Sequence, residues 1–140
     1  MCLALVLGAA QAATTSWKGT SSTAWATAAN WTAGVPNATV DAIIGDVSYT
    51  GSFVPEITKA ASCKSLTLGT NTTPPRSLTI TRGGITVSGN ITIGTSGTLP
   101  HSFSKAISLT GNWTNSGTYT YSGNKACPEW CQTMFVEFEG

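Results

Sequence analysis

The chain has 140 residues, enough for one domain with a modest core, and only 9% of them are charged. Hydrophobic residues make up 41%, and Thr, Ser, Gly and Asn fill much of the remainder, a composition that favours all-β structure over helix. The net charge is +1 and the seven basic residues form no cluster along the chain, which excludes an electrostatic footprint for nucleic acid or an anionic membrane.

Residues 1–12, MCLALVLGAAQA, form a short apolar run that ends in Ala10-Gln11-Ala12. This pattern is typical of a secretory signal peptide with its cleavage site, and the run is too short to span a bilayer. We therefore expect cleavage after Ala12 and a product that is secreted or on the outer cell surface, with no transmembrane segment in the mature chain. No basic residue precedes the run, so the signal peptide is expected to be incomplete. The alternative is a buried N-terminal strand.

Residues 13–61 are expected to form a module rich in tryptophan, with Trp17, Trp25 and Trp31 close together. Three indoles separated by small residues make a bulky plug, which favours a cap over the open hydrophobic end of the repeats that follow. The alternative is a platform for sugar rings, because an indole presents a large apolar face with a polar edge. The candidates for that carbohydrate-binding role are Trp25, Trp31 and Trp130, the tryptophans expected to be most exposed.

Residues 62–123 are a series of short segments in which apolar residues alternate with Thr or Ser. The period of two residues is the pattern of half-buried strands, and turn-forming residues separate nearly every pair of segments. The expected strands are SLTLG (65–69), SLTIT (77–81), GITVSG (84–89), NITIG (90–94), AISLTG (106–111) and GTYTYSG (117–123).

The repeat itself predicts the fold, because the segment SGNIT (88–92) returns further along the chain as TGNWT (110–114). Strands this short cannot bury their apolar faces alone, but copies stacked on one another can. We predict an all-β fold, a right-handed parallel β-helix (β-solenoid) with the Trp-rich module as its N-terminal cap. The Gly-Asn pairs at 89–90 and 111–112 are expected at corners, where both residues tolerate positive φ and the Asn side chains can form a ladder. Three residues of one coil are expected to match three of the next: Ile85 with Ile107, Val87 with Leu109, and Ile91 with Trp113.

The C-terminal part departs from this regularity. Residues 124–132 are expected to be an inserted loop in which Cys127 and Cys131 can form a disulfide in an oxidising compartment, and residues 133–140 to start a further coil. Cys63 is expected to be a small buried hydrophobe. Two cysteines without a second pair or a nearby histidine are weak grounds for a metal site, so no metal is expected. No polar cap follows, and we expect the chain to be truncated at its C-terminus.

The sequence assigns no catalytic residue and no cofactor. Only Glu137 and Glu139 share a face of an expected strand, and their place at the chain end indicates a solvated edge. His101, the single histidine, is expected in a surface turn, and a Ser-His-Asp arrangement would have to recruit Asp41 or Asp46 from far along the chain. No phosphate-binding glycine loop and no dinucleotide motif is present. An enzyme is therefore not expected.

Several short motifs carry a resemblance to known proteins. They are Trp17-x-Gly19, Trp25, Ala29-Asn30-Trp31, Gly34-Val35-Pro36, Asp41, Pro55-x-Ile57 and Cys63-x-Ser65-Leu66-Thr67. With the repeats that follow, they resemble the N-terminal part of bacterial secreted β-helical surface proteins, which are autotransporter-like or haemagglutinin-type repeat adhesins. The resemblance spans residues 16–123 and, weakly, 133–140. It implies the scaffold and says almost nothing about activity, and the loop at 124–132 departs from the family's pattern.

We therefore expect a non-catalytic secreted or cell-surface β-solenoid with an adhesin-like or extracellular-matrix role. It would present a surface rich in Thr, Ser and Asn to polysaccharide, to other cell surfaces or to copies of itself, through many weak contacts. The alternative is a carbohydrate-binding module that uses exposed tryptophans. A polysaccharide lyase or hydrolase on the same scaffold is the third possibility.

Overall fold

The computed structural model describes residues 13–70, 76–102, 106–122 and 136–138. Within these ranges the chain is almost entirely strand and turn, with one short 3-10 helix, η1 (Ala28–Asn30). The strands are β1 (Ala13–Ser16), β2 (Val40–Ile44), β3 (Glu56–Ile57), β4 (Ala61–Cys63), β5 (Leu66–Leu68), β6 (Arg76–Ser77), β7 (Thr79–Ile80), β8 (Ile85–Val87), β9 (Ile91–Ile93), β10 (Gly97–Ser102), β11 (Ile107–Leu109), β12 (Trp113–Asn115), β13 (Thr118–Ser122) and β14 (Val136–Phe138).

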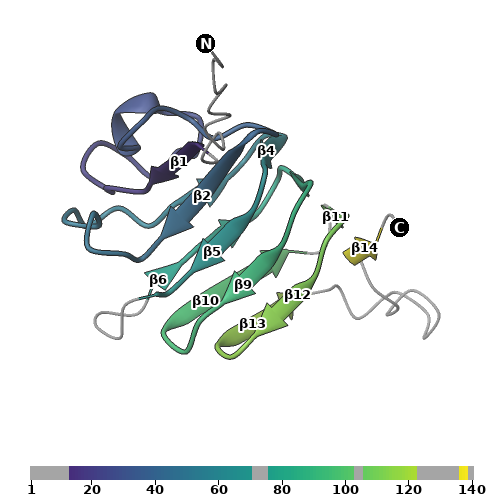
Figure 1. The fold of residues 1–140 in the computed structure, drawn as a ribbon. Coiled ribbons are helices and arrows are strands. Elements are labelled where there is room, and N and C mark those ends of the chain that lie inside the picture. The colour runs from purple at the N-terminus through teal and green to yellow at the C-terminus, as the bar shows by residue number, and fades with distance from the viewer. Residues whose placement is uncertain (1–12, 71–75, 103–105, 123–135, 139–140) are drawn as a thin grey trace, which may run out of the picture.

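The strands form three parallel sheets, and successive strands of the chain belong to different sheets. The chain therefore winds as a β-solenoid of about four coils (Figure 1), which confirms the predicted fold class. The first sheet has the order β1-β2-β5-β9-β12, the second β13-β10-β7-β3 with β6 also paired to β10, and the third β14-β11-β8-β4.

The registers between coils are those expected from the repeat. Ile85 pairs with Ile107 and Ile91 pairs with Trp113, so both sheets advance by the same interval along the chain. The interval between Leu66 and its partner Ile91 is longer, because the connection from β5 to the second sheet is longer in that coil. Equal spacing is not needed, since an insertion in a corner leaves the strand registers intact.

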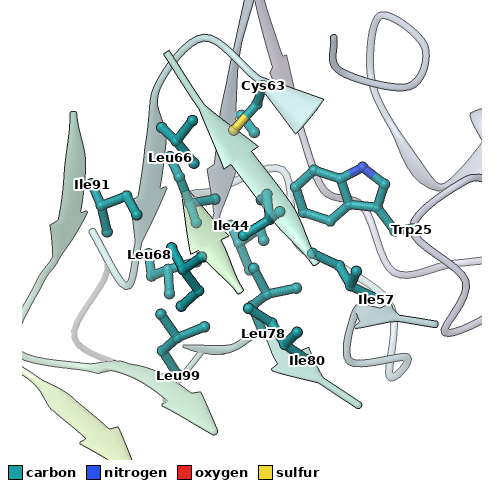
Figure 2. Packing of buried hydrophobic residues seen from close by; sticks show 14 of the residues in the cluster. Trp25, Ile44, Ile57, Cys63, Leu66, Leu68, Leu78, Ile80, Ile91 and Leu99 are labelled. Atoms are coloured by element: carbon teal, nitrogen blue, oxygen red, sulfur yellow. The ribbon is translucent and has the colours of Figure 1, made fainter. Parts of the chain in front are cut away.

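The inward-facing side chains fill the solenoid with one hydrophobic core (Figure 2). In the first sheet Ile44, Leu68 and Ile93 stack directly on one another and are fully buried. In the third sheet Cys63 stacks on Val87 and is also fully buried, as expected for a small hydrophobe. Burying each such Leu or Ile side chain contributes about 1.5–3 kcal/mol, so the stacked columns are the main source of stability.

The tryptophan module closes the N-terminal end of this core, as predicted. Trp31 makes edge-to-face contacts with Trp17 and Trp25, with ring centroids 5.0 and 4.8 Å apart. The Trp17 indole N–H donates to Phe53 O over 2.9 Å, and that of Trp31 donates to Trp25 O over 2.8 Å. The same module covers two sheet edges, since β1 pairs with β2 and the backbone N–H of Trp25 donates to Glu56 O in β3.

Asn30 holds the polypeptide of this module in place from inside. Its side chain is fully buried, and its Oδ1 accepts hydrogen bonds from the backbone N–H groups of Ser21 and Ser22, both 3.0 Å long. Its Nδ2 donates to Ser22 Oγ over 3.1 Å and to Ala24 O over 3.2 Å. All the hydrogen-bonding capacity of the amide is therefore used, as a buried polar group requires.

Two of the predicted boundaries need correction. Because β2, β3 and β4 already form a complete coil, the solenoid begins at Val40, and the predicted boundary between residues 61 and 62 falls inside β4. Strand β14 pairs with β11 and is therefore the third strand of the fourth coil, where the sequence predicted the start of a further coil. The predicted loop at 124–132 lies outside the described residues.

The Gly-Asn pairs do lie at corners, but the reason for glycine is different from the one predicted. Gly89 and Gly111 do not have positive φ; a Cβ at Gly111 would overlap Gly89 O and lie 2.5 Å from Asn90 Oδ1. Glycine is needed because the coils approach closely here. The expected ladder joins side chain to backbone, with Asn90 Oδ1 accepting from the N–H of Asn112 over 2.9 Å.

Candidate functional site

The outer faces of the solenoid carry columns of hydroxyl groups, one residue from each coil. We call these the hydroxyl columns. They consist of Thr67, Thr92 and Thr114 on the first sheet, Ser77, Thr98 and Thr118 on the second, and Ser62, Thr86 and Ser108 on the third. In β5, β9 and β11 the residues on either side of the hydroxyl are buried in the core, so the alternation of the sequence places the hydroxyls outside.

The hydroxyl columns are a repetitive surface with no charge of their own. Neighbouring members of a column are about 4.7–4.9 Å apart, the distance between paired strands. A hydroxyl both donates and accepts, so each column can exchange hydrogen bonds with a ligand that repeats along the solenoid axis. Each exposed contact is weak, so binding to such a surface depends on many contacts made together.

The fold also brings together two basic residues that are far apart in the sequence. Ile57 pairs with Ile80, and Lys59 and Arg82 each follow two residues later, at the corner between the second and third sheets. Both side chains are exposed. The two residues form no cluster along the sequence, because they lie one coil apart in the chain; the coil period is the signal that reveals this pair. We call Lys59 and Arg82 the basic corner.

The tryptophans predicted to bind sugars are not exposed. Trp25 and Trp31 are only 5% and 2% exposed, because they pack on each other and on the first coil (Figure 2 shows Trp25 beside Ile57). The expectation that they lie on the surface is therefore wrong, and their ring faces are not free to stack on a sugar. Trp130, Cys127 and Cys131 lie outside the described residues.

His101 is also placed differently from the prediction. It lies in β10 and is only 1% exposed, because it points inward between Ile80 and Tyr121 of the adjacent coils. Its Nδ1 lies 3.0 Å from Tyr119 Oη, and its ring makes an edge contact with Tyr121 at 5.5 Å. Burial, with Tyr121 as the second cause, raises the pKa of Tyr119 above its ordinary value. The six-residue length of β10 explains the error, since a turn was expected where the strand continues.

Cys63 is a structural thiol with an unreactive environment. Burial raises its pKa to about 12, and the nearby negative charge of Asp41 contributes in the same direction. Asp41 Oδ1 is itself buried without a hydrogen-bond partner among the described residues, as is the indole nitrogen of Trp25. A neutral thiol at this position is consistent with a packing role.

The other described acidic groups are engaged in local structure. Asp46 accepts a 2.6 Å hydrogen bond from Ser16 Oγ and a 2.9 Å bond from the N–H of Ser48. Glu56 accepts a 2.8 Å bond from Thr81 Oγ1. In the described part of the chain, no three His, Cys, Asp or Glu residues are gathered in a way that could hold a metal ion. Glu137 lies in β14, where its backbone pairs with Ser108 of β11, and Glu139 lies outside the described ranges.

Comparisons with known proteins identify a family without assigning a function. The family described as "Domain of unknown function (DUF8693)" matches residues 16–129, which include the tryptophan module and most of the solenoid. No curated protein and no solved structure matches the chain. None of the helices among the described residues is long and apolar enough to cross a membrane.

Proposed function

This chain belongs to the DUF8693 family, a family of unknown function, and from its surfaces we propose that it is a non-catalytic, secreted or cell-surface β-solenoid with an adhesin-like or extracellular-matrix role. The observation that carries the proposal is the set of hydroxyl columns on all three outer faces. They would act by multivalent contact with polysaccharide, with other cell surfaces or with copies of the same chain.

The difference between the inward-facing and outward-facing side chains supports this proposal. The inward residues of the described coils pack as one hydrophobic core, and the outward ones are mainly Ser and Thr. The resemblance of the sequence to bacterial β-helical surface proteins, and the apolar run at residues 1–12, agree with a protein that works outside the cell.

The alternative, a carbohydrate-binding module that uses exposed tryptophans, is less well supported. Two of its three candidate residues, Trp25 and Trp31, are committed to the cap and have no free ring face. Stacking on indole needs such a face, whereas hydrogen bonding by many hydroxyls does not. We therefore favour contact through the outer faces of the sheets.

The test compares single molecules with dense arrays. The protein would be coupled to beads at low and high density and passed over films of neutral polysaccharide, acidic polysaccharide and the protein itself. We expect retention to rise much more steeply than coating density, because several weak contacts must form at once. Soluble monomer should bind the same films only weakly.

The variant Thr67→Val/Thr92→Val/Thr114→Val removes one hydroxyl column while keeping side-chain shape and strand preference. It should reduce retention at high coating density. The control variant, Thr20→Val/Thr50→Val, removes two exposed hydroxyls of the cap region and should change retention little. Tight binding by the monomer, release of sugar from a film, or no retention on any film at any density would each contradict the proposal.

A further inference from the structure

The basic corner is a place where the fold puts two like charges on adjacent coils. Lys59 and Arg82 lie at the same corner but one residue out of register, because the backbone of Gly83 packs directly against that of Lys59. Adjacent coils are about 4.7–4.9 Å apart. Like charges held on neighbouring coils repel one another.

Nothing in the described part of the chain neutralises these two charges. Neither side chain makes an ion pair or a hydrogen bond with a described residue. The nearest acidic residue along the chain is Glu56, and its carboxylate already accepts a hydrogen bond from Thr81 Oγ1. Two exposed cations on adjacent coils, without such partners in the described ranges, are an arrangement that an external anion would stabilise.

A hydroxyl column lies directly after the basic corner. The third sheet contributes Ser62 and Thr86, which pair with one another and follow Lys59 and Arg82 by three and four residues. A ligand that follows the corner along the solenoid axis would therefore meet a cation at each of two coils and the hydroxyl groups of the third sheet beside them.

We propose that the basic corner binds an acidic polysaccharide, a chain of sugar rings bearing carboxylates, laid along the solenoid axis. This proposal rests on the function proposed above and names the ligand class of that surface. The carboxylates would accept charge-assisted hydrogen bonds from Lys59 and Arg82, and the sugar hydroxyls would exchange hydrogen bonds with Ser62 and Thr86. The distance between adjacent coils along the solenoid axis is close to the length of one ring in an extended polysaccharide. Successive rings can therefore contact successive coils.

The charge distribution favours a sparsely charged glycan over nucleic acid. Duplex DNA carries about one phosphate per 1.7 Å of its axis and is bound by proteins with extended basic surfaces. Here two cations stand on a chain whose net charge is +1. One carboxylate per sugar ring matches one cation on each of these two coils.

The test measures binding of the full chain to oligogalacturonate, with neutral maltooligosaccharide and a short DNA duplex as comparison probes. The variant Lys59→Gln/Arg82→Gln should lose affinity for oligogalacturonate by about tenfold or more, because two charge-assisted bonds are removed. The matched control, Lys18→Gln/Lys64→Gln, removes the same charge elsewhere and should keep its affinity. Added salt should weaken binding of the wild type more than that of the corner variant.

A stability measurement separates binding from folding. Because the corner charges repel one another, Lys59→Gln/Arg82→Gln should unfold at the same or a higher temperature than the wild type without ligand, while binding less. Equal losses in both double variants, a preference for the DNA duplex, or equal affinity for the neutral probe would overturn the proposal. Retention of dense beads on a neutral film would in those cases still support the broader function, so the two failures are distinguishable.

Discussion

Replacing Asn30 by alanine should loosen the cap of the solenoid and reveal how far the coils depend on it. The change removes four hydrogen bonds, two accepted by Oδ1 and two donated by Nδ2. At about 0.5–1.5 kcal/mol net for each bond, the expected loss is about 2–4 kcal/mol, since the serine N–H groups are partly buried and can regain some contact with water. That is a large share of the roughly 5–15 kcal/mol typical of a whole domain.

The assay is equilibrium unfolding in urea, followed by tryptophan fluorescence. With a urea dependence of about 2 kcal/mol per molar, the midpoint should fall by about 1–2 M. The matched control is Asn37→Ala, because Asn37 is exposed and its Oδ1 accepts only from the N–H and hydroxyl of Thr39. Water can replace those two bonds, so the control should cost less than about 1 kcal/mol. Midpoints that agree within error for the two variants would refute the assignment of Asn30 as the central hydrogen-bonding residue of the cap.

Three further predictions follow from the coils. Ile91→Ala should lower the free energy of unfolding by about 2–5 kcal/mol, and its outward neighbour Thr92→Ala by less than about 1 kcal/mol, in the same urea assay. Gly111→Ala should lower the free energy of unfolding by about 1–3 kcal/mol, because the added Cβ overlaps Gly89 of the adjacent coil. Gly111→Asn should be at least as destabilising. If Asn were tolerated better than Ala, a left-handed backbone at residue 111 would be the reason for glycine instead. Because the pKa of Cys63 rises to about 12 on folding, the wild type should lose stability relative to Cys63→Val as the pH rises from 9 towards 12; parallel pH curves would contradict this.

The repeat of Gly-Asn segments was enough to predict the architecture, because residues that are one period apart in the sequence of a solenoid lie next to each other on adjacent coils. Residues that recur with the period, such as Ile91 and Trp113, stack directly. The two-residue alternation then decides which side chains are buried. The recurring segment and the alternation are each read within a few residues. An insertion in a corner, such as the one that lengthens the coil between Leu66 and Ile91, therefore leaves both recognisable.

The cap could be predicted as a unit but not residue by residue. Tryptophan is large enough to be either a core residue or an exposed platform, and its sequence neighbours do not distinguish the two. Trp25 and Trp31 are buried because their rings pack on one another, a contact set by the path of the whole module. The role of Asn30 depends on the same path, since its partners lie in a turn six to nine residues away.

The position of His101, within the coils, was also not predicted correctly from its neighbours in the sequence. Its surroundings in the sequence, Leu99-Pro100-His101-Ser102, contain a proline, which favours a turn. The structure instead continues β10 through Pro100, and pairing with β13 places His101 on the inner side beneath Tyr121. The alternation from Leu99 predicts His101 on the inner side, and it is a stronger signal here than the single proline.

The basic corner follows from the period rather than from composition. A search for clusters along the chain compares residues a few positions apart, but the neighbours of a solenoid residue lie one coil away. Lys59 and Arg82 are separated by the same interval as their paired neighbours Ile57 and Ile80. Once the strand registers are known, charged residues can be grouped by the corner or face of the solenoid on which they lie, instead of by their neighbours in the sequence. For a protein whose interior is a packed core, that grouping is the physical basis for assigning a ligand, because the described core residues leave the outer faces and corners of the coils to bind one.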